Sequence, residues 1–286
     1  MIPEYPTFAP ITLEMRPVLH PLFQAVSNGV SEYAFANIYL FRETHHYAIS
    51  QAGENNYIFT GTDADQPFFF TPFGLPERKL LDELFQRFGS MKIVPGDQAH
   101  ELDLQGFRIW EDRDNFDYLY TREDLSHLPG PKFHKKKNLI NVFLRNHECI
   151  GRCLLESALP QAYAILDAWR AERGEDGDYA AAREALEQME YLQLCGGIYY
   201  VDDKPVAYVL GEENALGRNF LIHFEKATGM TEYKGLYQFI NRSFASILPD
   251  KYEFINREQD LGDPGLRQAK ESYHPSQFVK KYRVSV

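Results

Sequence analysis

The stretch that most constrains this chain is residues 252–275, which read YEFINREQDLGDPGLRQAKESYHP. It starts with the alternation of a half-buried strand and continues into a polar loop that Gly262, Pro264 and Gly265 close. Apolar residues at helical spacing follow the loop. A strand end, a polar loop and a helix start in one short segment are typical of sites in α/β proteins. The alternative is a solvated loop in which Asp260 caps the helix.

The hydrophobic pattern around this stretch predicts a mixture of helices and strands. Residues 160–286 read as two helices, three strands, a helix, a strand and a helix, ending in a short strand near residues 278–284. The third of these strands is predicted at residues 219–227, and the helix after it at residues 236–247. The first 125 residues show two helices and three strands, then alternating helices and strands. This order predicts a mixed α/β (α+β) fold with antiparallel hairpins.

A basic cluster marks the start of another predicted helix. Lys132, Lys135, Lys136 and Lys137 gather there with His134, ahead of apolar residues at helical spacing. Positive charge at a helix N-terminus opposes the helix dipole, at a cost of roughly 0.3–1 kcal/mol per exposed group. The whole chain is acidic, with a formal net charge of −11. The cluster therefore predicts an anionic ligand such as phosphate, tRNA or a lipid headgroup, and a solvated charged face is the alternative.

Several protein classes find no support in the sequence. Three cysteines without metal-ligand spacing argue against a disulfide framework and against a metal site, and they favour reduced thiols in a cytoplasmic protein. The N-terminus lacks the pattern of a signal peptide, and no apolar run approaches the roughly 18–20 residues of a membrane span. We therefore expect a cytoplasmic protein without an integral membrane segment.

A loop with two glycines, residues 228–235, connects the strand at 219–227 to the following helix. Gly229 and Gly235 would let backbone amides approach a ligand at the helix N-terminus, an arrangement that binds phosphate. Two glycines six residues apart fall well short of a P-loop, so this motif alone is weak.

Four segments together resemble one known family: FANIYLFR, YLYTREDLSHLPGPKFHKKKNLINVF, HFEKA with KGLYQFIN, and INREQDLGDPGLRQAKESYHP. They are similar to an uncharacterised bacterial family related to the C-terminal domain of phosphatidylglycerol lysyltransferase, over nearly the whole chain. The order of elements is also similar to the GNAT (acyl-CoA N-acyltransferase) fold. This resemblance implies two tandem GNAT-like domains, residues 1–125 and residues 126–286, with the site in the second.

The resemblance also implies an activity. The wider superfamily includes the Fem-type peptidoglycan aminoacyltransferases, which move an amino acid from aminoacyl-tRNA to an amine. We therefore expect acyl or aminoacyl transfer to an amine or hydroxyl acceptor, with aminoacyl-tRNA or acyl-CoA as donor and no tightly bound cofactor. The phosphatidylglycerol enzymes carry a large integral-membrane domain that this sequence does not show, which argues against a lipid acceptor. The GLRQAKESY segment looks like the late Fem-type helix whose lysine contacts the reacting carbonyl, and Lys270 matches that lysine.

Direct attack by the acceptor needs loss of its proton, a stabilised oxyanion and two substrates held in place. The sequence has no nucleophile elbow and no Cys/His signature, which favours transfer within a ternary complex over a covalent intermediate. We expect Lys270 to stabilise the oxyanion or the donor's 3′-end. Asp260 or Glu225 would accept the proton or orient the acceptor.

The remaining candidates bind substrate. Asn256 would hydrogen-bond it, Arg257 would clamp a phosphate or carboxylate, Lys234 with Gly235 would line the donor site, and Lys132, Lys135 and Lys136 would bind the donor's phosphates. Structural ion pairs are the alternatives, either between Arg257 and Asp260 or between Glu225 and a neighbour such as Lys226. A GNAT-like binding or regulatory module without catalysis is the alternative function.

Overall fold

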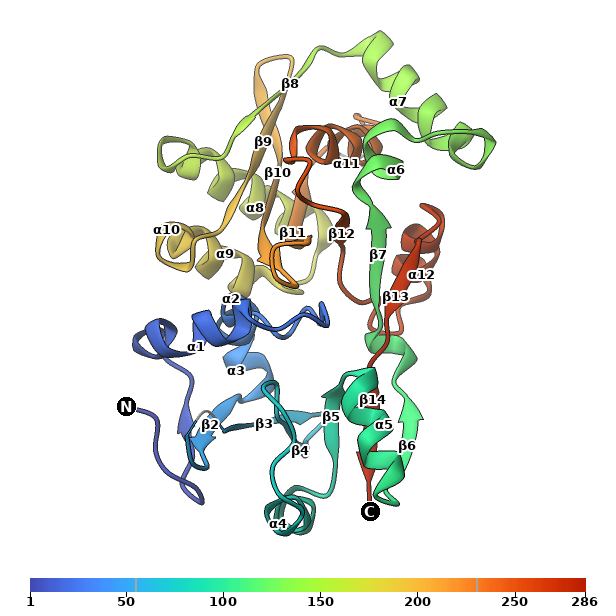
Figure 1. Cartoon of the computed structure of the whole chain (residues 1–286). Helices are drawn as coiled ribbons and strands as arrows, with labels where there is room; N and C mark the ends of the chain where they lie inside the picture. The colour runs from blue at the N-terminus through green and yellow to red at the C-terminus, as the bar shows by residue number, and fades with distance from the viewer. Residues whose placement is uncertain (55, 230) are drawn as a thin grey trace.

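The computed structural model describes residues 1–54, 56–229 and 231–286. The chain forms two lobes, each built on a seven-stranded sheet (Figure 1). The first sheet has the strand order β1-β2-β3-β4-β5-β14-β6, and the second has the order β13-β7-β12-β11-β10-β9-β8. The mixture of helices with largely antiparallel strands agrees with the predicted fold class.

The strands of the first sheet are β1 (Ala9–Pro10), β2 (Ala48–Gln51), β3 (Tyr57–Asp63), β4 (Gln66–Phe70), β5 (Met91–Val94), β6 (Arg108–Glu111) and β14 (Tyr282–Ser285). Those of the second are β7 (Asp117–Thr121), β8 (Cys149–Cys153), β9 (Cys195–Val201), β10 (Lys204–Asn214), β11 (Asn219–Ala227), β12 (Phe254–Asn256) and β13 (Gln277–Val279).

Within the described residues of the first half, the α-helices are α1 (Arg16–Gln24), α2 (Phe35–Leu40), α3 (Arg42–His45), α4 (Arg78–Phe88) and α5 (Gly96–Leu104). The described part of the second half has α6 (Arg122–His127), α7 (His134–Asn146), α8 (Leu159–Arg173), α9 (Tyr179–Glu187), α10 (Met189–Leu192), α11 (Leu236–Ile247) and α12 (Pro264–Glu271). Short 3₁₀ turns lie at Leu13–Met15, Arg113–Asn115, Pro131–Phe133 and Glu156–Ala158. Among the described residues, no helix combines the length and the apolar character needed to cross a lipid bilayer.

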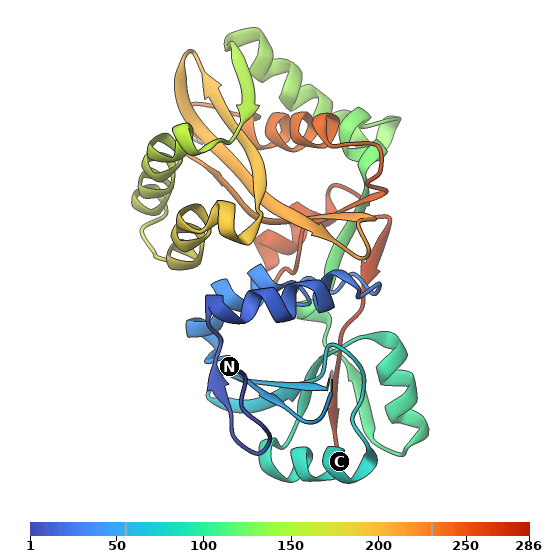
Figure 2. The same cartoon turned by 60° about the vertical axis from the view of Figure 1, so that its left-hand side comes forward.

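The two halves exchange one strand each. β7 follows β6 of the first sheet in the chain, but it lies between β12 and β13 of the second sheet. β14 follows β13 of the second sheet, but it lies between β5 and β6 of the first. Figure 2 shows this last segment running from one lobe into the other. The expected division between residues 125 and 126 places β7 in the first half and β14 in the second. In the structure, β7 belongs to the second sheet and β14 to the first.

Helix α2 lies between the halves, and all of its residues except Asn37 are apolar or aromatic. All six of its residues are buried, because α1 packs against it on one side and α9 of the second half on another. The same apolar cluster includes Phe59 and Phe70 of the first sheet and Ile198 and Leu210 of the second. A helix that is hydrophobic all round is typical of a core position. The two halves therefore share one core.

Candidate active site

The candidate site lies where β11 and β12 separate. These parallel strands pair only over Asn219–Leu221 and Phe254–Asn256, although β11 continues to Ala227. A β-bulge marks the point of separation: Leu210 pairs with Phe224 and the next residue, Gly211, pairs with Ile222. His223 is the extra residue in β11. A bulge bends its strand and redirects side chains, and this one lies just beyond Leu221, the last residue of β11 that pairs with β12. We call the unpaired interval between β11 and the segment that follows β12 the gap.

Glu225 and Arg257 face each other across this gap. The Arg257 Nη2 atom donates to the Glu225 Oε2 atom over 3.2 Å, and the two side chains are only 17% and 10% exposed. The structure forms neither of the ion pairs expected as alternatives, Arg257 with Asp260 or Glu225 with Lys226, and pairs Arg257 with Glu225 instead. Asp260 is bonded elsewhere, and Lys226 pairs with Asp178.

Lys136 of α7 reaches the same place from another side. Its Nζ atom lies 4.0 Å from the ring centroid of Tyr273 and donates to the Ser272 hydroxyl over 2.6 Å. The Arg257 guanidinium lies 5.3 Å from the same ring centroid. Burial, joined by the charge of Arg257, lowers the pKa of Lys136 to about 8. Two cations thus flank one aromatic ring, with Glu225 as the carboxylate beside them.

Lys270 holds the loop that carries Arg257. Its side chain is buried, and its Nζ atom donates to the backbone carbonyls of Arg257, over 2.6 Å, and of Gln259. The Tyr120 hydroxyl donates to the Lys270 carbonyl over 2.7 Å, which fixes the helix end on β7. Burial, with Arg257 nearby, lowers the pKa of Lys270 to about 8. In this structure the amine therefore holds the backbone of the loop through hydrogen bonds.

Asp260 is fully buried and surrounded by donors. It accepts hydrogen bonds from Arg113, from both Nε and Nη2 of Arg267, from the Tyr118 hydroxyl over 2.6 Å and from the Gly262 N–H. Burial alone would raise the pKa of Asp260, but the bonds from Arg267 and Tyr118 hold it well below its usual range. A carboxylate bound this way is a poor proton acceptor, which argues against that role. Asp260 does not cap the next helix either: Asp263 does, accepting from the Leu266 N–H over 2.7 Å.

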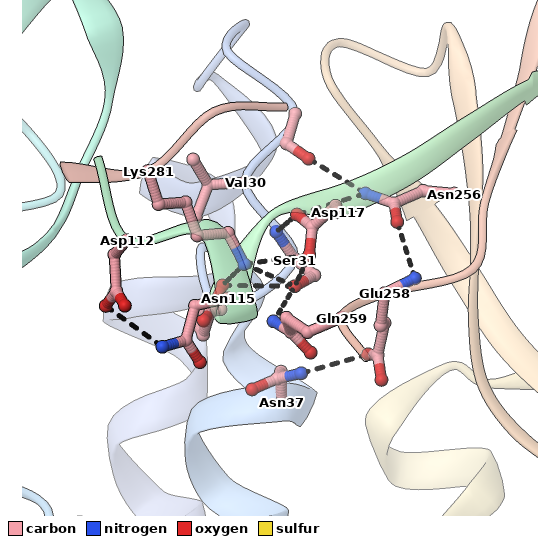
Figure 3. A network of polar contacts seen from close by, with 12 residues as sticks. Val30, Ser31, Asn37, Asp112, Asn115, Asp117, Asn256, Glu258, Gln259 and Lys281 are labelled. Atoms are coloured by element: carbon pink, nitrogen blue, oxygen red, sulfur yellow. Dashed lines mark hydrogen bonds and ion pairs between the residues drawn. The ribbon is translucent and has the colours of Figure 1, made fainter. Parts of the chain in front are cut away.

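Asn256 is also fully buried, and its side chain belongs to a polar network with Asp117 and Glu258 (Figure 3). Its amide nitrogen donates to the Gly29 carbonyl over 3.0 Å, and its oxygen accepts from the Glu258 N–H over 2.8 Å. These bonds anchor the loop to the first half, so the contacts of Asn256 are structural.

Other parts of the chain contact the two glycines of the loop at residues 228–235. Residue 230 of this loop lies outside the described residues. The Gly229 N–H donates to both carboxylate oxygens of Glu172, over 2.9 and 3.1 Å. Gly235 begins α11 with φ +102°, and a Cβ atom there would lie 2.4 Å from the Leu139 carbonyl of α7. Gly235 is therefore required by packing of α7, and Lys234 beside it is exposed.

The basic cluster divides between two surfaces. Lys136 faces the gap, whereas Lys132 and Lys135 are exposed on the outer side of α7 and of the turn before it. Lys132 forms an ion pair with Asp124 over 2.8 Å. The structure thus brings together Lys136, Arg257, Glu225 and Lys270, and it separates them from Lys132, Lys135 and Lys234.

Substitution of Gly235 tests the close approach of α7. We expect Gly235→Ala to lower the free energy of unfolding by about 2–5 kcal/mol, because the left-handed backbone and the clash with Leu139 both oppose a side chain. Gly89→Ala is the matched control, since Gly89 also has positive φ (76°) but has no atom within 4 Å of its Cβ position. It should cost about 1–2 kcal/mol. Equal costs in urea unfolding would contradict the packing role of Gly235.

The comparisons with known proteins agree with the resemblance found in the sequence. A family model described as phosphatidylglycerol lysyltransferase, C-terminal, matches residues 23–285. A conserved protein of unknown function from Bacteroides thetaiotaomicron is similar over 100% of both chains, at 28% identity and a TM-score of 0.85. The C-terminal domain of a putative lysylphosphatidylglycerol synthetase from Agrobacterium fabrum is similar over 96% of this chain and 91% of its own, at 13% identity and a TM-score of 0.66.

The tandem fold is confirmed by two further structures. FemX is similar over 98% of this chain and 97% of its own, at 8% identity and a TM-score of 0.59. A tandem GNAT protein from the clavulanic acid pathway covers 98% of both chains, at 7% identity and a TM-score of 0.54. The fold is therefore mixed α/β with two tandem GNAT-like halves. Together these similarities support a general role in acyl or aminoacyl transfer.

Proposed function

We propose that this chain, which belongs to the phosphatidylglycerol lysyltransferase C-terminal family, transfers an aminoacyl group from aminoacyl-tRNA to an amine or hydroxyl acceptor. The acceptor atom attacks the carbonyl carbon of the ester within a ternary complex. The ester C–O bond breaks, and the proton lost by the acceptor ends on the released 3′-oxygen of the donor. A CoA thioester is the second candidate donor, and a binding module without catalysis is the alternative function.

The observation that carries this proposal is the convergence of Lys136 and Arg257 on Tyr273, next to Glu225. Two cations on partly buried side chains can bind an anionic donor, and the carboxylate beside them can orient an acceptor. In this scheme Lys136 binds donor phosphate, Arg257 clamps a phosphate or carboxylate, and Glu225 orients the acceptor. Lys270 supports the Arg257 loop through the carbonyls of Arg257 and Gln259, and in this scheme its charge also stabilises the developing oxyanion.

The cysteines support direct transfer. Burial, with Asp202 nearby, raises the pKa of the Cys149 thiol to about 12, so it stays protonated at neutral pH. Burial, with Glu212 and Glu213 nearby, also raises the pKa of the Cys195 thiol on β9, and Cys153 lies on β8 at the edge of the second sheet. A protonated or distant thiol is a poor nucleophile, which favours attack by the acceptor itself.

Two features favour tRNA over a CoA ester. The Gly229 N–H, which would bind a diphosphate, already binds the Glu172 carboxylate, and α7 covers Gly235. A second anion at this loop would meet the negative charge of Glu172. The exposed lysines on and before α7 instead offer a surface for a polyanion, on a chain that is otherwise acidic.

Thermal unfolding with candidate donors tests the proposal. Bulk aminoacylated tRNA at about 100 times its dissociation constant should stabilise the chain by roughly 2.7 kcal/mol, which raises the midpoint by several degrees. The shift in midpoint should decrease as the salt concentration rises. In Lys136→Gln, the slope of the logarithm of the tRNA binding constant against the logarithm of the salt concentration should fall by about the value of one phosphate contact. Lys79→Gln, an exposed lysine on α4, is the matched control and should change neither quantity.

Two outcomes would contradict the proposal. A shift with acetyl-CoA that ignores salt, together with none for tRNA, would make the protein a CoA-dependent acyltransferase. No shift with either donor would favour the binding module.

A further inference from the structure

His223, the extra residue of the β11 bulge, lies between two carboxylates. Its Nε2 atom is 3.0 Å from the Glu212 Oε1 atom, and its Nδ1 atom is 2.9 Å from the Glu258 Oε1 atom. The imidazole is fully buried, and the two carboxylates are only 7% and 15% exposed. Glu212 comes from β10 and Glu258 from the loop after β12, so the histidine spans the gap between the strands.

This geometry defines the protonation state of the ring. A neutral imidazole donates through one nitrogen and accepts through the other, whereas an ionised carboxylate only accepts. Two carboxylates on opposite nitrogens therefore require two N–H groups, which is the imidazolium form. Burial alone would lower the pKa of His223, but the bonds to Glu212 and Glu258 raise it to about 9. The negative charge of Glu258 also acts on Lys226 and Lys270, in the direction that raises the pKa of each lysine.

Glu258 is the residue that fixes the loop. Its backbone is left-handed, with φ +54°, a conformation that costs a non-glycine residue roughly 1–2 kcal/mol. Its N–H donates to Asn256, and its carbonyl accepts from the Tyr118 N–H over 3.2 Å. Its side chain accepts from His223 and, over 3.1 Å, from Asn37 of α2 in the first half. Arg257 immediately precedes this fixed residue.

We propose that His223 is a positioning residue, whose imidazolium bridges Glu212 and Glu258 and thereby holds the loop at residues 256–260 with Arg257 facing Glu225. The bridge sets the spacing of the gap, because it ties β10 and β11 to the segment that has left the sheet. Asn37 extends the same contact to α2, so the first half also fixes the loop. The inference rests on the proposed function only for the ligand that Arg257 would bind.

The test uses NMR of the whole chain and needs no donor. In the wild-type protein at pH 7, both ring nitrogens of His223 should be protonated. The Arg257 Nε–H signal, assigned by its loss in Arg257→Lys, should be resolved and slow to exchange with water. In His223→Gln that exchange should be at least tenfold faster, because glutamine cannot donate to two carboxylates on opposite sides.

Two further variants separate positioning from general loss of structure. In Glu212→Gln the ring keeps both partners, since the amide oxygen still accepts, so the Arg257 signal should stay while the pKa of His223 falls. His147→Gln is the matched control: His147 has one carboxylate partner, Asp202, at 3.0 Å and lies away from the gap. It should leave the Arg257 signal unchanged.

The pH dependence of stability gives an independent readout. Because the folded pKa of about 9 lies above 6.5, the contribution of His223 is complete below pH 6.5 and is lost as the pH rises to about 9. The difference in unfolding midpoint between the wild type and His223→Gln should shrink over that range. A His223 ring with a single protonated nitrogen at pH 7, or unchanged Arg257 exchange in folded His223→Gln, would overturn the proposal. If His223→Gln does not fold, the wild-type ring titration and Glu212→Gln decide.

Discussion

Lys281→Met is expected to lower the free energy of unfolding by about 3–5 kcal/mol, because it leaves two buried carboxylates without their counter-charge. Lys281 lies between β13 and β14 and is fully buried. Its Nζ atom bonds to Asp117 over 2.8 Å, to Glu32 and to the Ser31 hydroxyl over 3.2 Å (Figure 3). Burial alone would lower the pKa of Lys281, but Asp117 and Glu32 raise it, so the amine stays charged.

The unfolding transition should be measured in urea with one tryptophan in each half as a probe. Trp110 lies on β6 and Trp169 on α8, and they are the two tryptophans of the chain. Lys280→Met is the matched control, because Lys280 pairs with Glu111 over 2.6 Å at the surface, with both side chains about half exposed. Exposed pairs contribute roughly 0–1 kcal/mol. A cost for Lys281→Met no larger than that of Lys280→Met would contradict the expectation.

The strand exchange explains why both probes should report one transition. Lys281 lies where the chain crosses from the second sheet to the first, and Asp117 lies where it crosses in the opposite direction. Their ion pair therefore joins the two crossings. Loss of this contact therefore weakens the attachment of both β7 and β14 to their sheets. The halves also share an apolar core. Separate transitions at Trp110 and Trp169 would mean that the halves unfold independently.

Local patterns in the sequence predicted the elements around the site. The strand expected at residues 219–227 and the helix at 236–247 match β11 and α11. The short strand expected near residues 278–284 is instead two strands, β13 and β14, which belong to different sheets. Periodicity reports which face of a strand is buried, but pairing with a strand some 160 residues away leaves no local mark. The exchange was therefore absent from the prediction.

The same limit applies to the site. Arg257, Glu225, Lys136 and Lys270 stood out because each is a charged residue in a strand, loop or helix that the family motifs also contain. His223 did not, since in NFLIHFEKA it reads as one polar residue in an apolar strand. The bulge breaks the alternation that sequence reasoning assumes, and Glu212 approaches only in the folded sheet. No local pattern in this strand predicts the contacts of His223 with Glu212 and Glu258.

Asp260 shows the opposite error. Its setting in a polar loop predicted a chemical role, but Arg113 from a distant segment and Arg267 from the helix after the loop bind it and turn it into an anchor. Tyr118 of β7, an exchanged strand, completes the same cluster. The family motif around residue 260 therefore includes residues that hold the loop as well as those that face the gap.

Lys270→Met is expected to lower the rate of donor deacylation by about 100- to 1000-fold, the effect of removing one oxyanion donor. The substitution also leaves the carbonyls of Arg257 and Gln259 without their shared donor, so a lower rate alone does not identify the role. Single turnovers should be measured with protein in excess over aminoacylated tRNA, with water or an added small amine as the acceptor of the aminoacyl group. A rate for Lys270→Met within threefold of the wild type would contradict both roles, and Lys280→Met should match the wild type.

The pH dependence distinguishes the two roles of Lys270. Its pKa of about 8 means that the amine is charged below pH 8 and increasingly neutral above it. A neutral amine still has two N–H groups, enough for both carbonyls, but it lacks the charge that stabilises an oxyanion. If Lys270 acts on the oxyanion, the wild-type rate should fall as the pH rises through about 8. Lys136 also has a pKa of about 8, so its loss of charge lowers the rate over the same range, and Lys270→Met is the comparison that decides. If Lys270 acts on the oxyanion, the fall near pH 8 should be smaller in Lys270→Met than in the wild type. If the lysine only holds the loop, both proteins should show the same fall.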